Sequence, residues 1–259
     1  MPVDNQYYNR PGDIWWDEQE VLNTLRTWVN PGRFGYAQEV LLQKLQLDPA
    51  GKKTLDVGCG GGILAEEFAR LGCVITGIDP SEASIITARK HAQASGLQID
   101  YHVGVGEDLP YEDNSFDIVY CCDVLEHVNN LEKVIAEIHR VLKKDGVFLF
   151  DTINRTLISN LVTIKVLQEW KATSVMPPNL HDWHMFIKPR ELQAIMSRHG
   201  LVSKEFVGLA PRANPLKILS LLLKRKRNQI TFKEIGESIG IKKSWNSSNL
   251  YAGYAIKIN

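Results

Sequence analysis

The stretch "TLDVGCGGGIL" (54–64) decides the fold, because it joins an apolar segment ending in an acid to a run of glycines. Residues 53–58 predict a strand, and the apolar spacing from Ile63 to Leu71 predicts a helix directly after the glycines. Glycines at such a turn let the backbone approach a ligand closely. Ligands of open α/β sheets bind at this edge, where strands end. We therefore expect a ligand at this loop.

Working outward, apolar segments of strand length alternate with segments of helical spacing. Such alternation predicts an α/β fold, with a parallel sheet covered by helices on both faces. We find no linker that would divide the chain, so residues 1–259 are expected to form one domain. The seven predicted strands are 53–58, 73–79, 99–104, 116–122, 147–153, 202–209 and 251–258, and the clearest helices are 63–71, 81–95 and 131–142.

Composition excludes several classes of protein. The 30 basic and 30 acidic residues cancel, so no overall positive field favours nucleic acid as a partner. The four cysteines have no CxxC spacing, which favours reduced thiols over a disulfide or zinc framework. No signal peptide is evident, and no apolar run reaches the about 18 residues needed to span a bilayer. We therefore expect a cytoplasmic protein.

The glycine spacing argues against a dinucleotide dehydrogenase, because the third glycine of that motif would fall at Ile63. Asp79 ends the next predicted strand, where an acid typically accepts hydrogen bonds from ribose hydroxyls. Cys59 in the loop has no paired histidine and is interpreted as a small residue that fits the turn.

With "GID" (77–79) and "LPYEDNSFDIVYCCDVLEHV" (109–128), the glycine loop resembles that of class I S-adenosylmethionine-dependent methyltransferases. Five further segments are similar to the ubiquinone-pathway O-methyltransferases that act on polyprenyl catechols. The segments are "WW" (15–16), "NPGRFGY" (30–36), "DVLEHV" (123–128), "TINR" (152–155) and "HDWHMFIKPREL" (181–192).

This resemblance implies a Rossmann-like methyltransferase fold with a seven-stranded, mostly parallel sheet and a helical lid. The lid would be residues 1–50, with Trp15, Trp16 and Trp28 packed in it. Insertions at 154–188 and 211–249 are expected to cover the substrate site, and the stretch 214–229 within the second one departs from the family pattern. The implied cofactor is S-adenosylmethionine, and the implied acceptor is a small phenol or catechol. Methylation of nitrogen or carbon on another small molecule, or cofactor binding without catalysis, are the alternatives.

The resemblance also assigns roles to residues. Arg33 would bind the methionine carboxylate, Asp79 the ribose, and Cys122 would lie beside the adenosine. Many relatives have an acid where this chain has Val105, so Glu107 and Asp108 are the candidates near the adenine. The expected cofactor-binding residues are Arg33, Asp56, Gly58, Gly60, Asp79, Pro80, Glu107, Asp108, Cys122 and His127.

A phenol has a pKa of about 10, so it must lose its proton to a base or a cation. Asp123, Glu126 and His127 would share one face if their stretch were helical, and the resemblance implies that they hold Mg²⁺. Alternatively, Glu126 and His127 simply end the fourth strand without binding anything. The candidate catalytic residues are His181, His127 and Glu126, with His181 favoured over His184 as the base because it matches the family motif.

Two segments are not explained by the cofactor. Residues 157–170 carry leucines and isoleucine at helical spacing, and 215–228 join an apolar stretch to four basic residues at 224–227. Both are consistent with reversible contact with an anionic membrane surface. Alternatively, the apolar residues face the core and the basic residues form a solvated helix end.

Overall fold

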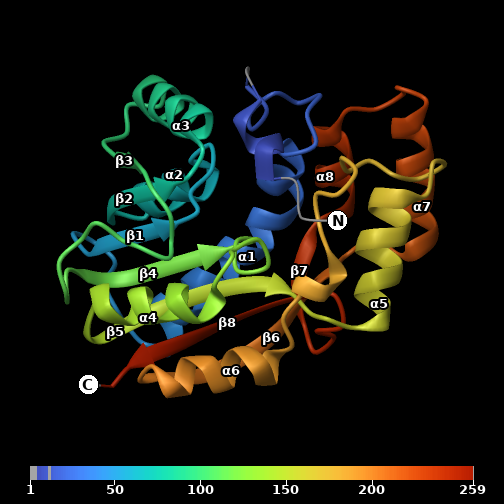
Figure 1. Cartoon of the computed structure of the whole chain (residues 1–259). Helices are drawn as coiled ribbons and strands as arrows, with labels where there is room; N and C mark the ends of the chain where they lie inside the picture. Colours follow the sequence, from blue (N-terminus) through green and yellow to red (C-terminus); the bar gives the residue numbers. More distant parts are fainter. Residues whose placement is uncertain (1–4, 11–12, 259) are drawn as a thin grey trace.

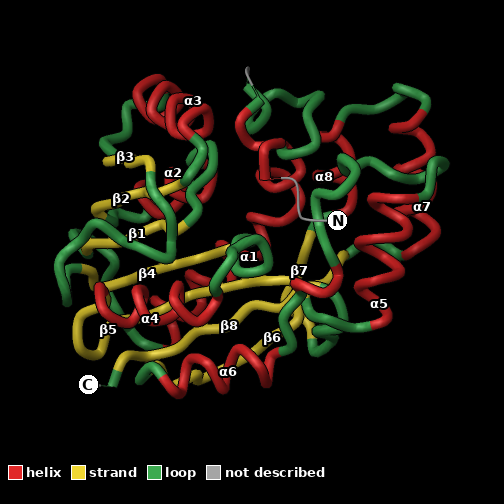
Figure 2. The backbone as a smooth tube through the Cα atoms, in the orientation of Figure 1, coloured by secondary structure: helices red, strands yellow, loops and turns green. Residues whose placement is uncertain are grey.

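One mixed sheet organises the chain, which a computed structural model describes over residues 5–10 and 13–258. Its strand order is β3-β2-β1-β4-β5-β8-β6-β7 (Figure 2). The part of the predicted lid at residues 1–4 and 11–12 lies outside the described residues. The strands are β1 (Lys53–Val57), β2 (Val74–Asp79), β3 (Asp100–Val103), β4 (Phe116–Cys122), β5 (Leu142–Ile153), β6 (Leu201–Pro211), β7 (Ile241–Ser244) and β8 (Leu250–Lys257).

Helices join most of these strands, and short 3₁₀ and π-helical turns extend several of them. The α-helices are α1 (Asn30–Gln38), α2 (Ile63–Arg70), α3 (Glu82–Ala94), α4 (Leu131–Val141), α5 (Leu157–Ser159), α6 (Pro189–Arg198), α7 (Pro215–Lys226) and α8 (Phe232–Ile239). The additional turns are η1 (Asn5–Asn9), η2 (Leu25–Val29), η3 (Glu39–Lys44), η4 (Asn160–Glu169) and η5 (Trp183–Met185). Ser81 caps α3 by accepting the Ser84 N–H, as its sequence position predicts.

Strands β1 to β5 run parallel to one another, whereas β8 is antiparallel to both β5 and β6. The chain order reverses between β1 and β4, and such a switch point is where open α/β sheets bind ligands. The α/β class and the mostly parallel sheet are therefore confirmed.

The sheet has eight strands rather than the seven predicted. The additional strand, β7, pairs with β6 at the edge of the sheet. Its sequence is "IKKS", in which only Ile241 is buried. Lysines are typical of edge strands, where they discourage pairing with other chains, but they remove the apolar alternation that makes a strand recognisable.

Two apolar layers cover the faces of the sheet (Figure 1). One face packs against α1, α2 and α3, with the fully buried Phe68 and Tyr120 rings stacked at its centre. The other face packs against α4 and α6 through side chains such as Ile138 and Leu192. Strand β1, which ends at the glycine loop, is therefore held by packing on both of its faces.

A third cluster lies beyond the carboxyl ends of the strands. It joins Trp15 and Leu22 of the N-terminal segment to α8, mainly through Phe232 and Ile235. Figure 1 shows these elements, together with α5 and α7, grouped on one side of the sheet. Within the described residues, no helix has the length and apolarity needed to cross a membrane.

Lys257 fastens the end of β8 to the end of α4. Its buried ammonium donates to the carbonyls of His139 and Leu142, at 2.8 Å each, and to Asn114 Oδ1 at 2.9 Å. Lysine is well suited to this position because a cation complements the C-terminal end of a helix.

We predict that Lys257→Met lowers the free energy of unfolding by about 1.5–3 kcal/mol, because three acceptors lose a charged donor in a buried site. Urea denaturation followed by circular dichroism measures this change. Lys144→Met, at an exposed position of the neighbouring β5, is the matched control and should change stability little. Equal stability of the two variants would show that the buried ammonium contributes nothing net.

Candidate active site

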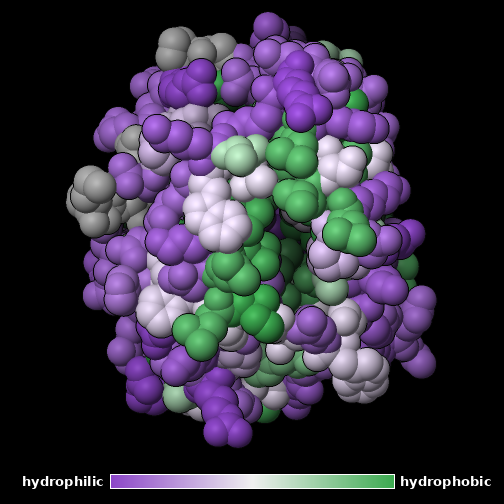
Figure 3. All heavy atoms as spheres, turned by 90° about the vertical axis from the view of Figure 1, so that its right-hand side faces the viewer, coloured by the Kyte–Doolittle hydropathy of each residue, from purple (hydrophilic) through white to green (hydrophobic). Residues whose placement is uncertain are grey.

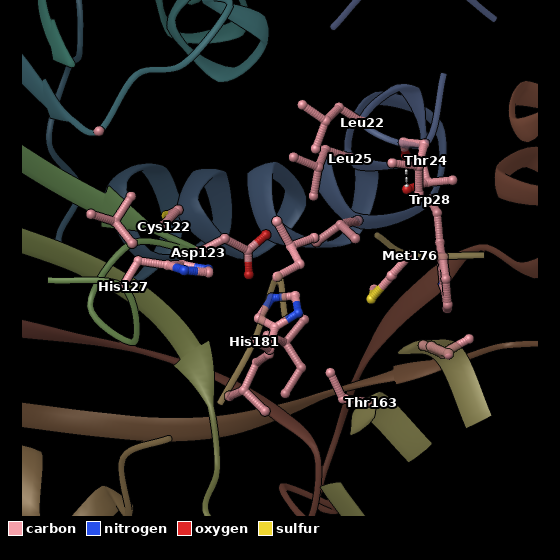
Figure 4. Close-up of a pocket in the computed structure, with 18 of the residues that line it drawn as sticks. Leu22, Thr24, Leu25, Trp28, Cys122, Asp123, His127, Thr163, Met176 and His181 are labelled. Atoms are coloured by element: carbon pink, nitrogen blue, oxygen red, sulfur yellow. Dashed lines mark hydrogen bonds between the residues drawn. The ribbon is translucent and has the colours of Figure 1, made fainter. Parts of the chain in front are cut away.

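A cavity of about 1040 Å³ opens at the carboxyl edge of the sheet. It is lined by the glycine loop at one end and by apolar residues of η2, η4 and α7 at the other. Figure 4 shows Asp123, His127 and His181 between these ends, with Leu25, Trp28 and Met176 farther along. A single space therefore connects the loop to polar and then to apolar side chains.

The glycine loop lies so close to neighbouring side chains that residues larger than glycine would not fit there. Gly58 and Gly60 have φ angles of +76° and +50°, in the left-handed region that favours glycine. A Cβ atom on Gly58 would lie 2.3 Å from Val124 Cγ2, and one on Gly61 would lie 2.3 Å from Trp15 Cγ. The N-terminal segment thus packs directly on the loop.

Asp79 ends β2 beside this loop, and its two carboxylate oxygens hold backbone N–H groups. Oδ2 accepts from Gly60 and Oδ1 accepts from Ser81, at 2.9 Å each. Burial raises the pKa of Asp79 above its usual value, and these two hydrogen bonds oppose the rise. Asp79 and Pro80 both line the cavity, where the sequence predicts ribose contacts.

Arg33, on α1, lies in a network of two carboxylates. Its Nη2 donates to Asp151 Oδ1 at 2.9 Å, its Nε donates to Asp151 Oδ2, and its Nη2 also bonds Asp123 Oδ2. Its Nη1 donates to Asn30 Oδ1 at 2.9 Å. Within the described part of the chain, four of the five guanidinium N–H groups are therefore in use, and one on Nη1 is left for the predicted methionine carboxylate.

The other residues predicted to bind the cofactor do not all line the cavity. Cys122 and Glu107 line the cavity, and Glu107 Oε1 also accepts the N–H of Asn129 at 3.0 Å. Asp56 lines it too, and burial raises the pKa of Asp56 to about 8, so it holds its proton at neutral pH. Asp108 is exposed and does not line the cavity, so Glu107 is the better candidate near the adenine.

His127 and His181 both line the cavity and lie next to each other, with ring centroids 5.0 Å apart. Burial lowers the pKa of His127 to about 4 and that of His181 to about 3, so both rings are neutral at pH 7. Gln168, on η4, holds the His181 backbone by donating to its carbonyl at 3.1 Å and accepting its N–H at 2.8 Å. His184 is exposed and lies outside the cavity lining.

The predicted magnesium site does not fit the structure. Residues 123–127 form a turn instead of a helix, so Asp123, Glu126 and His127 do not share a helix face. Asp123 pairs with Arg33, while Glu126 is buried behind the cavity lining and accepts the Thr152 hydroxyl at 2.7 Å. Across residues 5–10 and 13–258, no three His, Cys, Asp or Glu side chains are arranged to hold a metal ion.

Three residues of this site are not predicted from the sequence. Asp151, Gln168 and Asn30 orient the predicted residues rather than contact the loop. Asp151 can be recognised in the sequence, because it is a charged residue within the apolar strand "VFLFDTI". A charge in a buried strand must be paired, which predicts a cationic partner. Gln168 and Asn30 had no comparable signal.

We predict that Gly61→Ala displaces the N-terminal segment, because the new Cβ would overlap the Trp15 ring. The expected result is a red shift of tryptophan fluorescence and a loss of stability of about 1–3 kcal/mol, typical of overpacking. Gly35→Ala is the matched control, since a Cβ on Gly35 meets nothing within 4 Å. Identical spectra and stability for both variants would show that Trp15 does not rest on the loop in solution.

Comparison with known proteins agrees with this geometry. Residues 55–150 match the model of a methyltransferase domain. Similar chains include the ubiquinone biosynthesis O-methyltransferases of Pseudomonas syringae, 39% identical over 203 residues (78% of this chain, 83% of the relative), and Pasteurella multocida, 39% identical over 219 residues (81% and 86%). Among solved structures, the YcgJ protein of Bacillus subtilis superposes with a TM-score of 0.58 at 19% identity, covering 86% of this chain and 99% of that one, and shows the same fold. The chain therefore belongs to the family of ubiquinone biosynthesis O-methyltransferases and is an S-adenosylmethionine-dependent methyltransferase.

Proposed function

We propose that this protein methylates a phenolic hydroxyl, most simply that of a catechol bearing an apolar tail. The observation that carries the proposal is the single cavity, in which the glycine loop, two neutral imidazoles and an apolar channel follow one another. The names of the relatives support the same class of acceptor. Methylation of nitrogen or carbon remains the alternative that product analysis would reveal.

S-adenosylmethionine supplies an electrophilic methyl group on a positively charged sulfur. The residues that would hold it are those at the loop end of the cavity, with Asp79 at the ribose and Gly58 beside the methionine part. The loop suits such a ligand because Gly58 and Gly60 leave the backbone bare. The protein's main task is to hold the acceptor oxygen in line with the methyl group.

His181 is the proposed general base, with His127 next to it. A neutral imidazole can accept the phenolic proton as the oxygen attacks, and the charge that results faces the nearby Asp123, which partly opposes the lowering of both ring pKa values by burial. No step is assigned to Mg²⁺, because the three residues predicted to hold it diverge. Glu126 is given no catalytic role in this proposal, because it is buried and is not among the residues that line the cavity.

The apolar end of the cavity would hold the tail. Val162 and Val166 of η4 face it from one side, and Ile218 and Leu219 of α7 line it as well. Figure 3 shows hydrophobic side chains gathered around a hollow on the face that carries α5 and α7. Each methylene group of a tail buried there would contribute about 0.8 kcal/mol to binding.

We predict that His181→Ala lowers kcat for methylation of a tailed catechol by about 100- to 10,000-fold, the usual contribution of general base catalysis. Calorimetry should show that the affinity for S-adenosylhomocysteine is kept. His184→Ala, the matched control on the same segment, should stay active because His184 does not reach the cavity.

The pH dependence of kcat/KM and the effect of EDTA on activity test the same assignment. Because burial lowers the pKa of His181 to about 3 and that of His127 to about 4, protonation of these two imidazoles should not reduce kcat/KM between pH 8 and pH 5. A fall that begins near pH 6 is expected only from Asp151, whose pKa burial raises to about 6. An acid limb near the ordinary histidine pKa of about 6.5 would show that the ring titrates without this lowering, and it would still fit a histidine as the base. Full activity of His181→Ala, or loss of wild-type activity in EDTA, would contradict the assignment of His181 as the general base. Either result would favour a metal cation as the group that activates the phenol.

We also propose that the face around the tail channel makes reversible contact with an anionic membrane surface. Leu157 and Leu216 are 84% and 80% exposed, on α5 and α7 respectively, and the Trp245 side chain is fully exposed next to the cavity-lining Asn246. Large apolar residues grouped on one surface typically mark an interaction site. At the basic end of α7, Arg225 donates to the Gln19 carbonyl and covers the Phe232 ring. We therefore assign Arg225 to stabilising the fold and not to contact with the membrane.

We predict that the variant Lys224→Glu/Lys226→Glu/Arg227→Glu loses binding to anionic liposomes in a flotation assay. Each basic residue near such a surface contributes about 1 kcal/mol, so reversing three exposed charges should abolish a weak interaction. The control variant Lys53→Glu/Lys90→Glu/Lys144→Glu changes three exposed lysines on β1, α3 and β5 and should float like the wild type. Equal flotation of all three proteins, or none at low salt, would refute the membrane contact.

A further inference from the structure

The methionine part of S-adenosylmethionine carries an ammonium group as well as a carboxylate, and the network around Arg33 bears on both. Arg33 presents one positive charge to the two carboxylates of Asp151 and Asp123. The three side chains together therefore keep one negative charge. A site with that balance attracts a cation more readily than a third carboxylate.

Asp123 is the member of this network that can reach a ligand. Asp151 is fully buried and does not line the cavity, whereas Asp123 does and is 23% exposed. Figure 4 shows the Asp123 side chain extending into the pocket between His127 and His181. Its Oδ2 bonds Arg33, while its Oδ1 accepts no hydrogen bond from the part of the chain that the structure describes.

The backbone of Asp123 is held in an unusual conformation. Its φ angle is +54°, which is uncommon for a residue with a side chain, and its N–H donates to Asp151 Oδ1 at 3.0 Å. Asp151 thus fixes Arg33 through two bonds and the backbone of Asp123 through a third. Such conformations persist where the surroundings hold them, and they are concentrated at functional sites.

The other acids that line the cavity are already engaged. Both oxygens of Asp79 accept backbone N–H groups, and Oε1 of Glu107 accepts the N–H groups of Asn129 and Asn130, while Glu107 itself is the candidate for the adenine end of the site. Asp56 keeps its proton at neutral pH, because burial raises its pKa to about 8. Among the described residues that line the cavity, Asp123 is therefore the carboxylate that is placed next to Arg33 and keeps an oxygen for a positive group.

We propose that Asp123 binds the ammonium group of the methionine part of S-adenosylmethionine and that Arg33 positions Asp123 while lending its remaining Nη1 N–H to the carboxylate. This inference rests on the proposed cofactor site. It replaces the role of Asp123 as a metal ligand with that of a cofactor-binding residue.

The test compares ligands that differ by one group. S-adenosylhomocysteine and its deamino analogue, in which hydrogen replaces the α-amino group, are titrated into the protein by calorimetry in EDTA. We expect Asp123→Asn to weaken S-adenosylhomocysteine about 10- to 100-fold, as for loss of a charged hydrogen bond, and to leave the deamino analogue unchanged. Asp145→Asn is the matched control, since Asp145 also has a positive φ, +62°, but is exposed and outside the cavity lining.

A second variant protects the test against misfolding. Asp123→Gly removes the carboxylate and suits the positive φ, so it should show the same selective loss. Equal weakening of both ligands, no weakening of either, or a loss that appears only with added Mg²⁺ would overturn the inference. If the wild type bound no S-adenosylhomocysteine, the cofactor site itself would be wrong, and that first titration separates the two failures.

Discussion

The buried ion pair between Arg33 and Asp151 is the constraint on which the site depends. It joins α1 to the carboxyl end of β5, two segments far apart in the sequence. Burial raises the pKa of Asp151 to about 6, and the guanidinium beside it opposes a larger rise. Breaking one partner of such a pair typically costs about 3–5 kcal/mol, because an uncompensated charge stays inside. The pair therefore fixes the position of α1, and with it η2 and the wall of the cavity.

A second constraint comes from the order of the strands. Because β1 lies between β2 and β4, the loops that follow β1 and β4 diverge and leave a crevice at the sheet edge. The segments that close this crevice come from the two ends of the chain and from the stretch after β5. The sheet thus supplies the cofactor end, and the covering segments supply the acceptor end. The acceptor can differ between related proteins without any change to the strands.

Periodicity predicted the parts of this fold that obey local rules. The strands from 53–58 to 147–153 are visible because they are apolar and bounded by turn residues, and Ser81 marks its helix by capping it. β7 was missed because "IKKS" is polar on an edge. The segment 123–127 was interpreted as a candidate helix face, but the bond from the Asp123 N–H to Asp151 holds it as a turn. That bond links residues 28 positions apart, and no local pattern contains it.

The direction of β8 has a practical consequence. Since β8 is antiparallel to β5, it carries the chain away from the cavity, and Lys257 is pinned against the far end of α4. Figure 1 shows the C-terminus on the side opposite α5 and α7. A reporter protein or a solid support coupled after β8 would leave both the cavity and the exposed leucines accessible.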